Sequence, residues 1–101
     1  MHKTTTQTAN GHPPRFVLGQ VTATRAVLEH LEGKGIDPSE ILKRHVRGDW
    51  GDMPPEDIAE NEFAVGRRLR LLSSYTIGGE RVWVITEADR SATTLLFPSE
   101  Y

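Results

Sequence analysis

Residues 69–98 read LRLLSSYTIGGERVWVITEADRSATTLLFP. Three runs in this stretch are rich in β-branched and aromatic side chains, and two turn signals, Gly78-Gly79 and Asp89-Arg90-Ser91, separate them. Glycine accepts the positive φ that a tight hairpin needs. The pattern therefore predicts a three-stranded antiparallel meander in the last third of the chain.

The middle run of the meander carries apolar side chains on both of its faces. Alternate residues of a strand point to opposite sides of the sheet. One face therefore holds Val82, Val84, Thr86 and Ala88, and the other holds Arg81, Trp83, Ile85 and Glu87. We expect helices to cover one face and a large ring, Trp83 or Trp50, to shield part of the other.

A further strand is predicted at residues 16–21, FVLGQV, which form a short run rich in aromatic and β-branched side chains. Gly19 inside this run marks a bulge or a close approach of another backbone. The pattern leaves open whether the strand is central, lies at an edge of the sheet or is irregular.

Three helices are predicted between this strand and the meander. The strongest local signal is residues 37–40, Asp-Pro-Ser-Glu, which supply a capping side chain, a proline at the first helical position and a glutamate three residues after the cap. The first helix is expected to begin after Thr22 or Thr24, where a hydroxyl can cap it. The predicted spans end near Glu32, Gly48 and Gly66, and the third begins at Pro55.

These elements define one α+β domain over residues 15–101. We expect a four-stranded sheet, made of the N-terminal strand and the C-terminal antiparallel meander, with two or three helices packed on one face. Residues 1–14, MHKTTTQTANGHPP, contain almost nothing apolar and end in two prolines. They are predicted to form a disordered N-terminal tail.

Composition excludes several classes of protein. The 101 residues carry a formal net charge of −2, which excludes a strongly basic polyanion binder that works by net charge alone. No cysteine is present, so disulfides, thiolate zinc sites and cysteine nucleophiles are excluded and a cytoplasmic location is expected. The longest apolar run, residues 82–85, is far too short to cross a membrane.

The sequence holds no standard catalytic motif, neither a glycine-rich phosphate loop nor a G-x-S-x-G turn. Its four histidines, at positions 2, 12, 30 and 45, lack the spacing of metal ligands. We therefore expect no metal and no cofactor.

Residues 45–52, HVRGDWGD, place an imidazole, a guanidinium, two carboxylates and an indole at the end of the second helix. His45 could act as a general acid or base, and Arg47 could hold an anion with Trp50 as a stacking surface. The alternative, which we favour, is structural: His45 and Arg47 satisfy the last helical carbonyls, Asp49 forms an Asx turn, and Trp50 fills the edge of the core.

Residues 86–94, TEADRSATT, interrupt two hydrophobic strands with a polar connector. Arg90 could bind a phosphate or a partner's carboxylate, supported by the hydroxyl of Ser91 or Thr93. The alternative, again favoured, is a plain hairpin turn in which Asp89 bonds the backbone and Arg90 is solvated. In either case the connector and residues 45–52 are predicted to form one exposed polar patch.

From residue 16 to the end, above all in HVRGDWGD, RLLSSY and VWVITEADRSATTLLFPSEY, the chain resembles a family of short, uncharacterised bacterial proteins described as plasmid-related and carried on mobile elements. Some members of that family carry a label of type I restriction subunit. The resemblance implies a prokaryotic cytosolic protein encoded on mobile DNA.

The predicted order of elements, a strand, helices and then a three-stranded meander, is similar to that of RelE/ParE-type toxins, which cleave messenger RNA or attack topoisomerase. That resemblance implies phosphate stabilisation by Arg81 and Arg90 and proton transfer by His45 or Tyr75. The extra helix, the acidic residues at 49–62 and the net negative charge depart from the toxin pattern.

We therefore predict a non-enzymatic module that binds an unidentified protein or nucleic acid, with a small RelE-like ribonuclease as the alternative. Charged, aromatic-bearing loops without a recognisable catalytic set support the first hypothesis. No membrane contact is expected, and a monomer is slightly favoured over an oligomer. The predicted binding residues are Arg47, Asp49, Trp50, Glu87, Asp89, Arg90 and Ser91.

Overall fold

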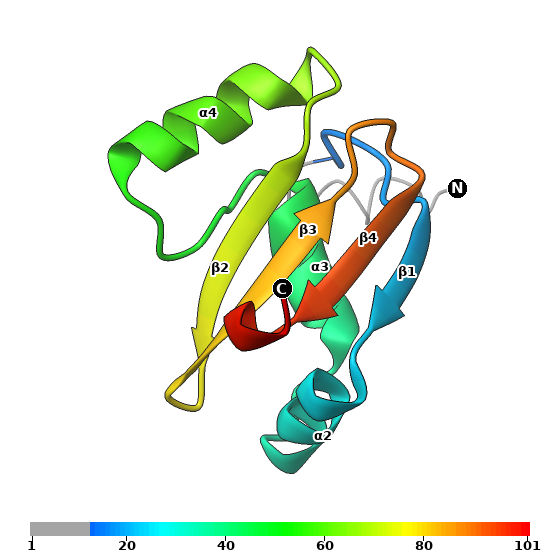
Figure 1. The fold of residues 1–101 in the computed structure, drawn as a ribbon, viewed down its shortest axis with the longest axis vertical. Helices are drawn as coiled ribbons and strands as arrows, with labels where there is room; N and C mark the ends of the chain where they lie inside the picture. The colour runs from blue at the N-terminus through cyan, green and yellow to red at the C-terminus, as the bar shows by residue number, and fades with distance from the viewer. Residues whose placement is uncertain (1–12) are drawn as a thin grey trace, which may run out of the picture.

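The computed structural model describes residues 13–101, so the predicted tail lies outside the described residues except for its last two. These residues form a four-stranded sheet, three α-helices and a short 3-10 helix (Figure 1), which confirms the predicted α+β class. Along the chain the elements are β1 (Gln20–Ala23), α2 (Arg25–Gly33), α3 (Pro38–Val46), α4 (Pro55–Val65), β2 (Leu71–Ile77), β3 (Glu80–Thr86), β4 (Ala92–Leu96) and η1 (Pro98–Glu100).

The predicted meander is confirmed. Strands β2, β3 and β4 are successive antiparallel neighbours, and the full strand order is β1-β4-β3-β2. Gly78 and Gly79 have φ of 56° and 83°, the two positive values of a type I′ hairpin turn. Strand β1 pairs with β4 in parallel, so the sheet is mixed.

Local capping chemistry sets the helix starts where the sequence predicts them. The hydroxyl of Thr24 accepts a hydrogen bond from the Val27 amide at 3.2 Å and begins α2. The carboxylate of Asp37 accepts one from the Ser39 amide at 2.9 Å and begins α3, with Pro38 at the first helical position.

The first strand lies farther along the chain than predicted. The pattern places it at residues 16–21, but β1 begins at Gln20, at the edge of the sheet. Phe16 instead packs its ring against those of His45 and Trp50, at centroid distances of 5.1 and 6.1 Å. Gly19 makes the predicted close approach: its φ is 67°, and a Cβ there would collide with the Ser91 backbone.

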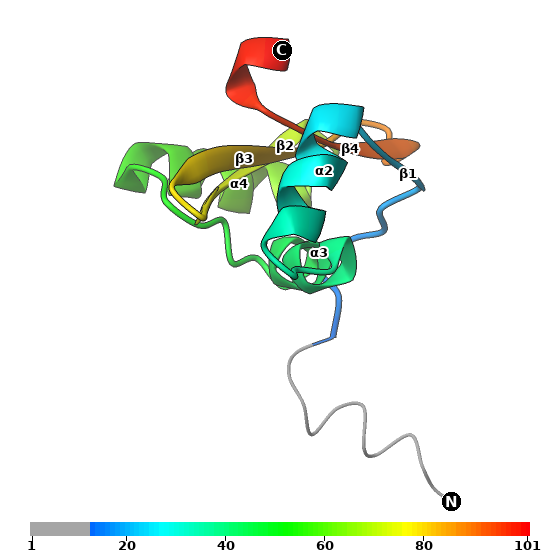
Figure 2. The same ribbon diagram turned by 90° about the horizontal axis from the view of Figure 1, so that it is seen from below.

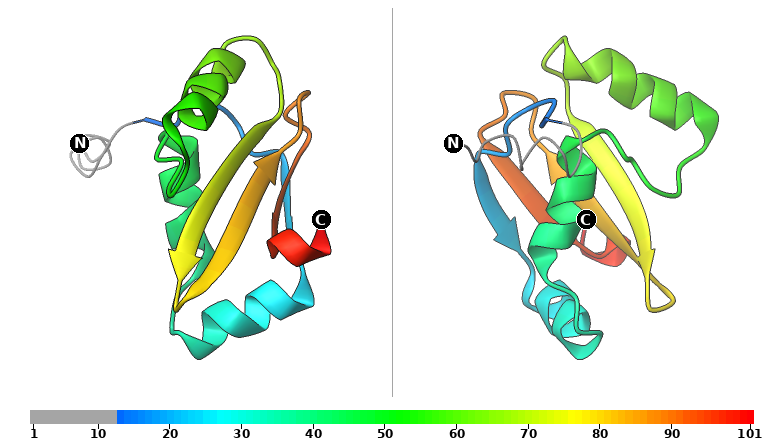
Figure 3. Two further views of the ribbon diagram at one scale, coloured as in Figure 1. Left: turned by 60° about the vertical axis from the view of Figure 1, so that its left-hand side comes forward. Right: turned by 180° about the vertical axis from the view of Figure 1, so that it is seen from behind.

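The two faces of the sheet are covered unequally. Helix α3 lies on one side and η1 lies on the other with the C-terminal residue, while α2 crosses the end of the sheet and buries Val27 and Leu31 on the α3 side (Figures 2 and 3). We call these sides the covered face and the open face. The main core lies beneath the covered face and consists of Val27, Leu31, Ile41, Tyr75, Val82, Val84 and Leu95.

Helix α4 does not cover a face of the sheet in the way that α3 does. It runs beside β2, at the edge opposite β1 (Figure 1). Its inward side chains join a second cluster of buried residues around Trp50 and Leu71. The predicted packing of helices on one face therefore applies to two of the three α-helices.

Candidate functional site

His45 lies in the interior of the protein and not in an exposed patch. Its side chain is 0% exposed, between α3 and the covered face of the sheet. One ring nitrogen, Nδ1, is 2.6 Å from Ser73 Oγ, and the other, Nε2, is 2.9 Å from Thr86 Oγ1. Thr86 in turn is 2.7 Å from Thr93 Oγ1.

The last hydrogen bond of this chain determines which atom is the donor in the Thr86–Thr93 and His45–Thr86 hydrogen bonds. Thr93 donates to the carbonyl of Leu18 at 2.7 Å, so it must accept from Thr86. The Thr86 oxygen then accepts from Nε2–H of His45. Nε2 of His45 therefore carries a proton, and in the neutral ring Nδ1 accepts from Ser73.

Burial keeps the His45 ring neutral. Desolvation, with a smaller contribution from the charge of Arg90, lowers the pKa of His45 from 6.5 to about 3. A ring that stays neutral at every physiological pH and touches no solvent cannot exchange protons with a substrate. Neither interpretation of His45 fits this geometry: the ring reaches no surface where it could act on a substrate, and it bonds Ser73 and Thr86 instead of the last carbonyls of α3.

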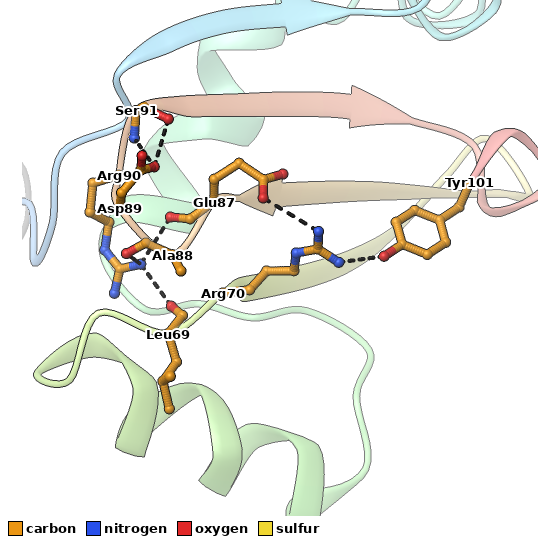
Figure 4. Close-up of polar contacts among 8 residues, drawn as sticks. All are labelled: Leu69, Arg70, Glu87, Ala88, Asp89, Arg90, Ser91 and Tyr101. Atoms are coloured by element: carbon orange, nitrogen blue, oxygen red, sulfur yellow. Dashed lines mark hydrogen bonds and ion pairs between the residues drawn. The ribbon is translucent and has the colours of Figure 1, made fainter.

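Arg90 is also buried, at 6% exposed. Its backbone is left-handed, with φ of 62°, and this conformation turns the guanidinium inward under the β3–β4 connector (Figure 4). Nη1 donates to the Leu69 carbonyl at 2.7 Å, and Nη2 donates to the Ala64 carbonyl at 3.0 Å. Longer hydrogen bonds reach the carbonyls of Val65, Glu87 and Ala88.

This geometry makes Arg90 a clamp between three segments. The Ala64 carbonyl belongs to the last turn of α4, which has no basic residue of its own. A cation at the negative end of a helix is favourable, and here it comes from the connector. Neither predicted role survives, because a guanidinium bound to five carbonyls is neither solvated nor free for a phosphate.

Trp50 and Tyr75 are buried on the same side of the sheet. The Trp50 indole N–H donates to Glu62 at 2.9 Å, which confirms the interpretation of this ring as core. The Tyr75 hydroxyl donates to the Asp49 carbonyl at 2.6 Å, and burial raises its pKa to about 12. The Asp49 carboxylate accepts from the Gly51 amide, which is the predicted Asx turn.

The predicted exposed patch is therefore not formed. Residues 45–52 and 86–94 do meet, but they meet inside the protein, where His45 contacts Thr86. Of the four candidates for catalysis, His45, Tyr75 and Arg90 are buried in structural hydrogen bonds, and Arg81 is exposed. The sequence could have indicated this, because Thr86 shares a strand face with Val82 and Val84.

The remaining predicted residues lie at the surface. Asp89 accepts hydrogen bonds from both the amide and the hydroxyl of Ser91, so this pair closes the connector turn (Figure 4). Arg47 is partly buried at the end of α3. Glu87 points to the open face and pairs with Arg70 at 3.3 Å.

The open face carries a cluster of side chains around two aromatic rings. Tyr101 is 69% exposed, and its ring meets the edge of Trp83 at a centroid distance of 5.9 Å. The guanidinium of Arg70 donates to both the Tyr101 hydroxyl and the Glu87 carboxylate (Figure 4). Arg81 lies on the same face two residues before Trp83, and its Nη1 donates to the Asp52 carbonyl and the Ser74 hydroxyl, each at 3.1 Å. We call Arg70, Arg81, Trp83, Glu87 and Tyr101 the open-face cluster.

A surface hollow of about 740 Å³ borders this cluster at Arg81. Helix α2 forms one wall of the hollow with His30, whose Nε2 lies 2.7 Å from the carbonyl of Ile77. Phe97 and Pro98 supply its apolar lining. The rest of the lining is mostly polar, with Glu29 and Glu80 beside Arg81, so the hollow is an open, mixed surface and not an apolar pocket.

Sequence reasoning placed Arg81, Trp83 and Glu87 on one face but assigned no role to Arg70 or Tyr101. Arg70 follows the same alternation, two residues before Leu72, and could have been placed with them. Nothing local indicates that Tyr101 folds back onto the sheet, because η1 is what turns the chain there.

Among residues 13–101, no group of His, Asp or Glu side chains is arranged to hold a metal ion. Within the same residues, no helix has the length and apolar character needed to span a membrane. No protein-family model matches the chain, and neither a curated protein nor a solved structure matches it. The open-face cluster is therefore the feature of the molecule that bears most directly on its function.

Proposed function

We propose that this protein is a non-catalytic binding module that docks a protein partner on the open face of its sheet. The observation that supports this proposal is the open-face cluster, in which an exposed tyrosine and a partly buried tryptophan adjoin two arginines. Trp, Tyr and Arg are the residues that contribute most binding energy at protein interfaces.

The charge of the molecule favours a protein over a nucleic acid as the partner. Nucleic acids are bound mainly by neutralising phosphates, and this chain has a net charge of −2. Within the cluster, Arg70 is already paired with Glu87. The fitting partner presents an apolar group to the ring pair and a carboxylate to the exposed guanidinium of Arg81, whose Nη1 also bonds the Asp52 carbonyl and the Ser74 hydroxyl.

The biological setting is part of the same proposal. The resemblance of HVRGDWGD and VWVITEADRSATTLLFPSEY to plasmid-related bacterial proteins supports a cytoplasmic protein of a mobile element. The ribonuclease alternative lacks comparable support, because it needs Arg90 and either His45 or Tyr75 at a surface, and all three are buried.

The test uses two matched charge reversals. Partners captured from the cells that make the chain are purified, and their Kd is measured with Arg81→Glu on the open face and Lys43→Glu on the exposed side of α3. We expect Arg81→Glu to raise the Kd about tenfold or more and Lys43→Glu to change it less than about twofold. Thermal melts establish that both variants fold.

Two binding results would overturn the proposal. One is equal binding by the two variants. The other is a shift of single-stranded RNA or DNA that weakens steeply with salt, which would identify a nucleic acid as the ligand. Cleavage of RNA that Arg81→Glu abolishes would support the ribonuclease instead.

A further inference from the structure

The two edge strands of the sheet, β2 and β1, differ in whether their outward main-chain groups are hydrogen-bonded. At the β2 edge, the side-chain amide of Asn61 bonds both main-chain groups of Leu72: Nδ2 donates to its carbonyl at 2.8 Å, and Oδ1 accepts from its amide at 3.1 Å. Two residues on, the Ser74 amide donates to the Trp50 carbonyl, and the Ser74 carbonyl accepts from the Asp52 amide. The outward groups of Leu72 and Ser74 are therefore satisfied.

The β1 edge has no such cover among residues 13–101. In a parallel pair, alternate residues bond the neighbouring strand. The amides of Gln20 and Thr24 donate to the β4 side at 3.0 Å, so Thr22 also faces β4. Val21 and Ala23 therefore direct their N–H and C=O groups away from the sheet, and beyond them Figure 1 shows no other element. Unpaired main-chain groups of this kind are a template for another strand.

The side chains along this edge favour a second copy of the same chain. Strand β1 reads QVTA and has no charge, so nothing in it repels its own image. Val21 is 42% exposed, which leaves apolar surface to bury. Thr22 bonds Thr94 across the ladder at 3.2 Å on the open face, and threonine pairs are favourable between neighbouring strands.

One register uses both outward residues. When two β1 strands run antiparallel with Thr22 opposite Thr22, Val21 of each copy lies opposite Ala23 of the other. Each such pair can exchange both of its main-chain hydrogen bonds. Shifting the register by one pair would place Gly19, whose φ is 67°, or the helical Arg25 in the ladder. The β1 edge is therefore self-complementary about Thr22.

We propose that two copies of this chain associate through their β1 edges, antiparallel and centred on Thr22. Residues directly opposite each other in a sheet point to the same face. The pairing therefore joins the two open faces into one continuous surface on one side of the dimer. The interface replaces the expected monomer with a two-fold assembly and does not depend on what binds the open face.

The absence of cysteine from the chain allows a direct test. Opposed residues of a pair that is not hydrogen-bonded have Cα atoms about 4.5 Å apart, within disulfide reach. Thr22→Cys should therefore form an intermolecular disulfide under mild oxidation. Gln20→Cys is the matched control, because Gln20 is also exposed on the same strand but lies about 13 Å from its image in this register.

We expect Thr22→Cys to cross-link at least about tenfold faster than Gln20→Cys, read on non-reducing gels. Equal rates, or faster cross-linking at Gln20, would overturn the register.

A charge exchange tests the association without a covalent bond. Thr22→Lys and Thr22→Glu each place like charges face to face, so each alone should sediment as a monomer, and an equimolar mixture should recover the dimer. If the unsubstituted chain sediments only as a monomer at about 1 mM, the proposal fails. It also fails if the mixture behaves as the separate variants do. Neither result bears on binding at Arg81, so this proposal and the proposed function can fail separately.

Discussion

Polar side chains serve different purposes on the two faces of the sheet. On the covered face, the hydroxyls of Ser73, Thr86 and Thr93 are fully buried and bond one another through His45. On the open face, Arg70 and Glu87 are about half exposed and bond each other at the surface. A buried polar group costs free energy whenever its partner is removed, whereas an exposed one is rehydrated by water. Changes on the covered side should therefore cost stability, and changes on the open side should cost binding.

The largest loss of stability is expected from Arg90→Ala, which removes the buried guanidinium beneath the β3–β4 connector. Five carbonyls would lose a charged donor, and alanine would keep the strained left-handed backbone. We expect the free energy of unfolding to fall by about 4 kcal/mol in urea titrations. Arg90→Lys is the control: it keeps the charge but not the fork, so it should recover only part of the loss.

His45→Ala should follow, at about 3 kcal/mol. The substitution leaves a cavity and removes the partner of both Ser73 and Thr86. The same urea titrations measure it. A loss below about 1 kcal/mol, the range of surface substitutions, would contradict the buried hydrogen-bond chain.

The burial of His45 should also make the stability of the protein depend on pH. Above pH 6.5, His45 is neutral in the folded and the unfolded chain. Below it, the unfolded chain binds a proton, while the folded chain, with a pKa of about 3, does not. Stability should therefore fall by about 1.4 kcal/mol per pH unit below pH 6.5, or about 2 kcal/mol at pH 5.

The control for this prediction is His45→Gln, which cannot titrate and should flatten that slope. Glu62 also has a lowered pKa, about 2, because Arg15 and Trp50 donate hydrogen bonds to its carboxylate. Its contribution to stability is lost only as the pH falls below 4.5, and it is present in both chains. Equal slopes in the two chains between pH 6.5 and 5 would show that His45 is not the group responsible.

Trp83→Ala tests whether this ring belongs to the open-face cluster or to the core, because the two locations predict different losses of stability. The ring is partly buried against the sheet, with its edge under Tyr101. We expect a loss of about 2 kcal/mol, below the 3–5 kcal/mol that a fully buried aromatic costs. Denaturant melts distinguish the two values, and the higher one would move Trp83 from the open-face cluster to the core.

The smallest effect is expected from Arg70→Ala combined with Tyr101→Ala. Both side chains are exposed, and exposed ion pairs contribute little to stability. The free energy of unfolding, measured by urea titration, should change by less than about 0.5 kcal/mol. A large loss would show that the C-terminal residue helps to hold the sheet together.

Local chemistry accounts for what the sequence could predict. The caps at Thr24 and Asp37, the glycine pair at 78–79 and the alternation in β3 each act over a few residues. The position of β1 depended on β4, more than seventy residues away, and could not be read from the 16–21 pattern.

The burial of Arg90 and His45 also depended on residues far away in the sequence, so it could not be predicted from the local pattern. Their partners lie on separate segments: Ala64 and Leu69 for Arg90, Ser73 and Thr86 for His45. A charged or titratable residue beside a turn or helix end usually lies at the surface, so composition favoured exposure. One signal pointed inward, since Thr86 lies on the same strand face as Val84 and a buried hydroxyl needs a partner.

The closed β2 edge also limits how large any assembly of this chain can become. A sheet with two bare edges can add neighbours in both directions without end, as fibrils do. A sheet with one bare edge can accept a single neighbour, after which growth stops. If two copies pair through β1 as proposed, the bonds from Asn61 and the segment at 50–52 to Leu72 and Ser74 should keep a third sheet from adding at β2 and so limit the assembly to a dimer.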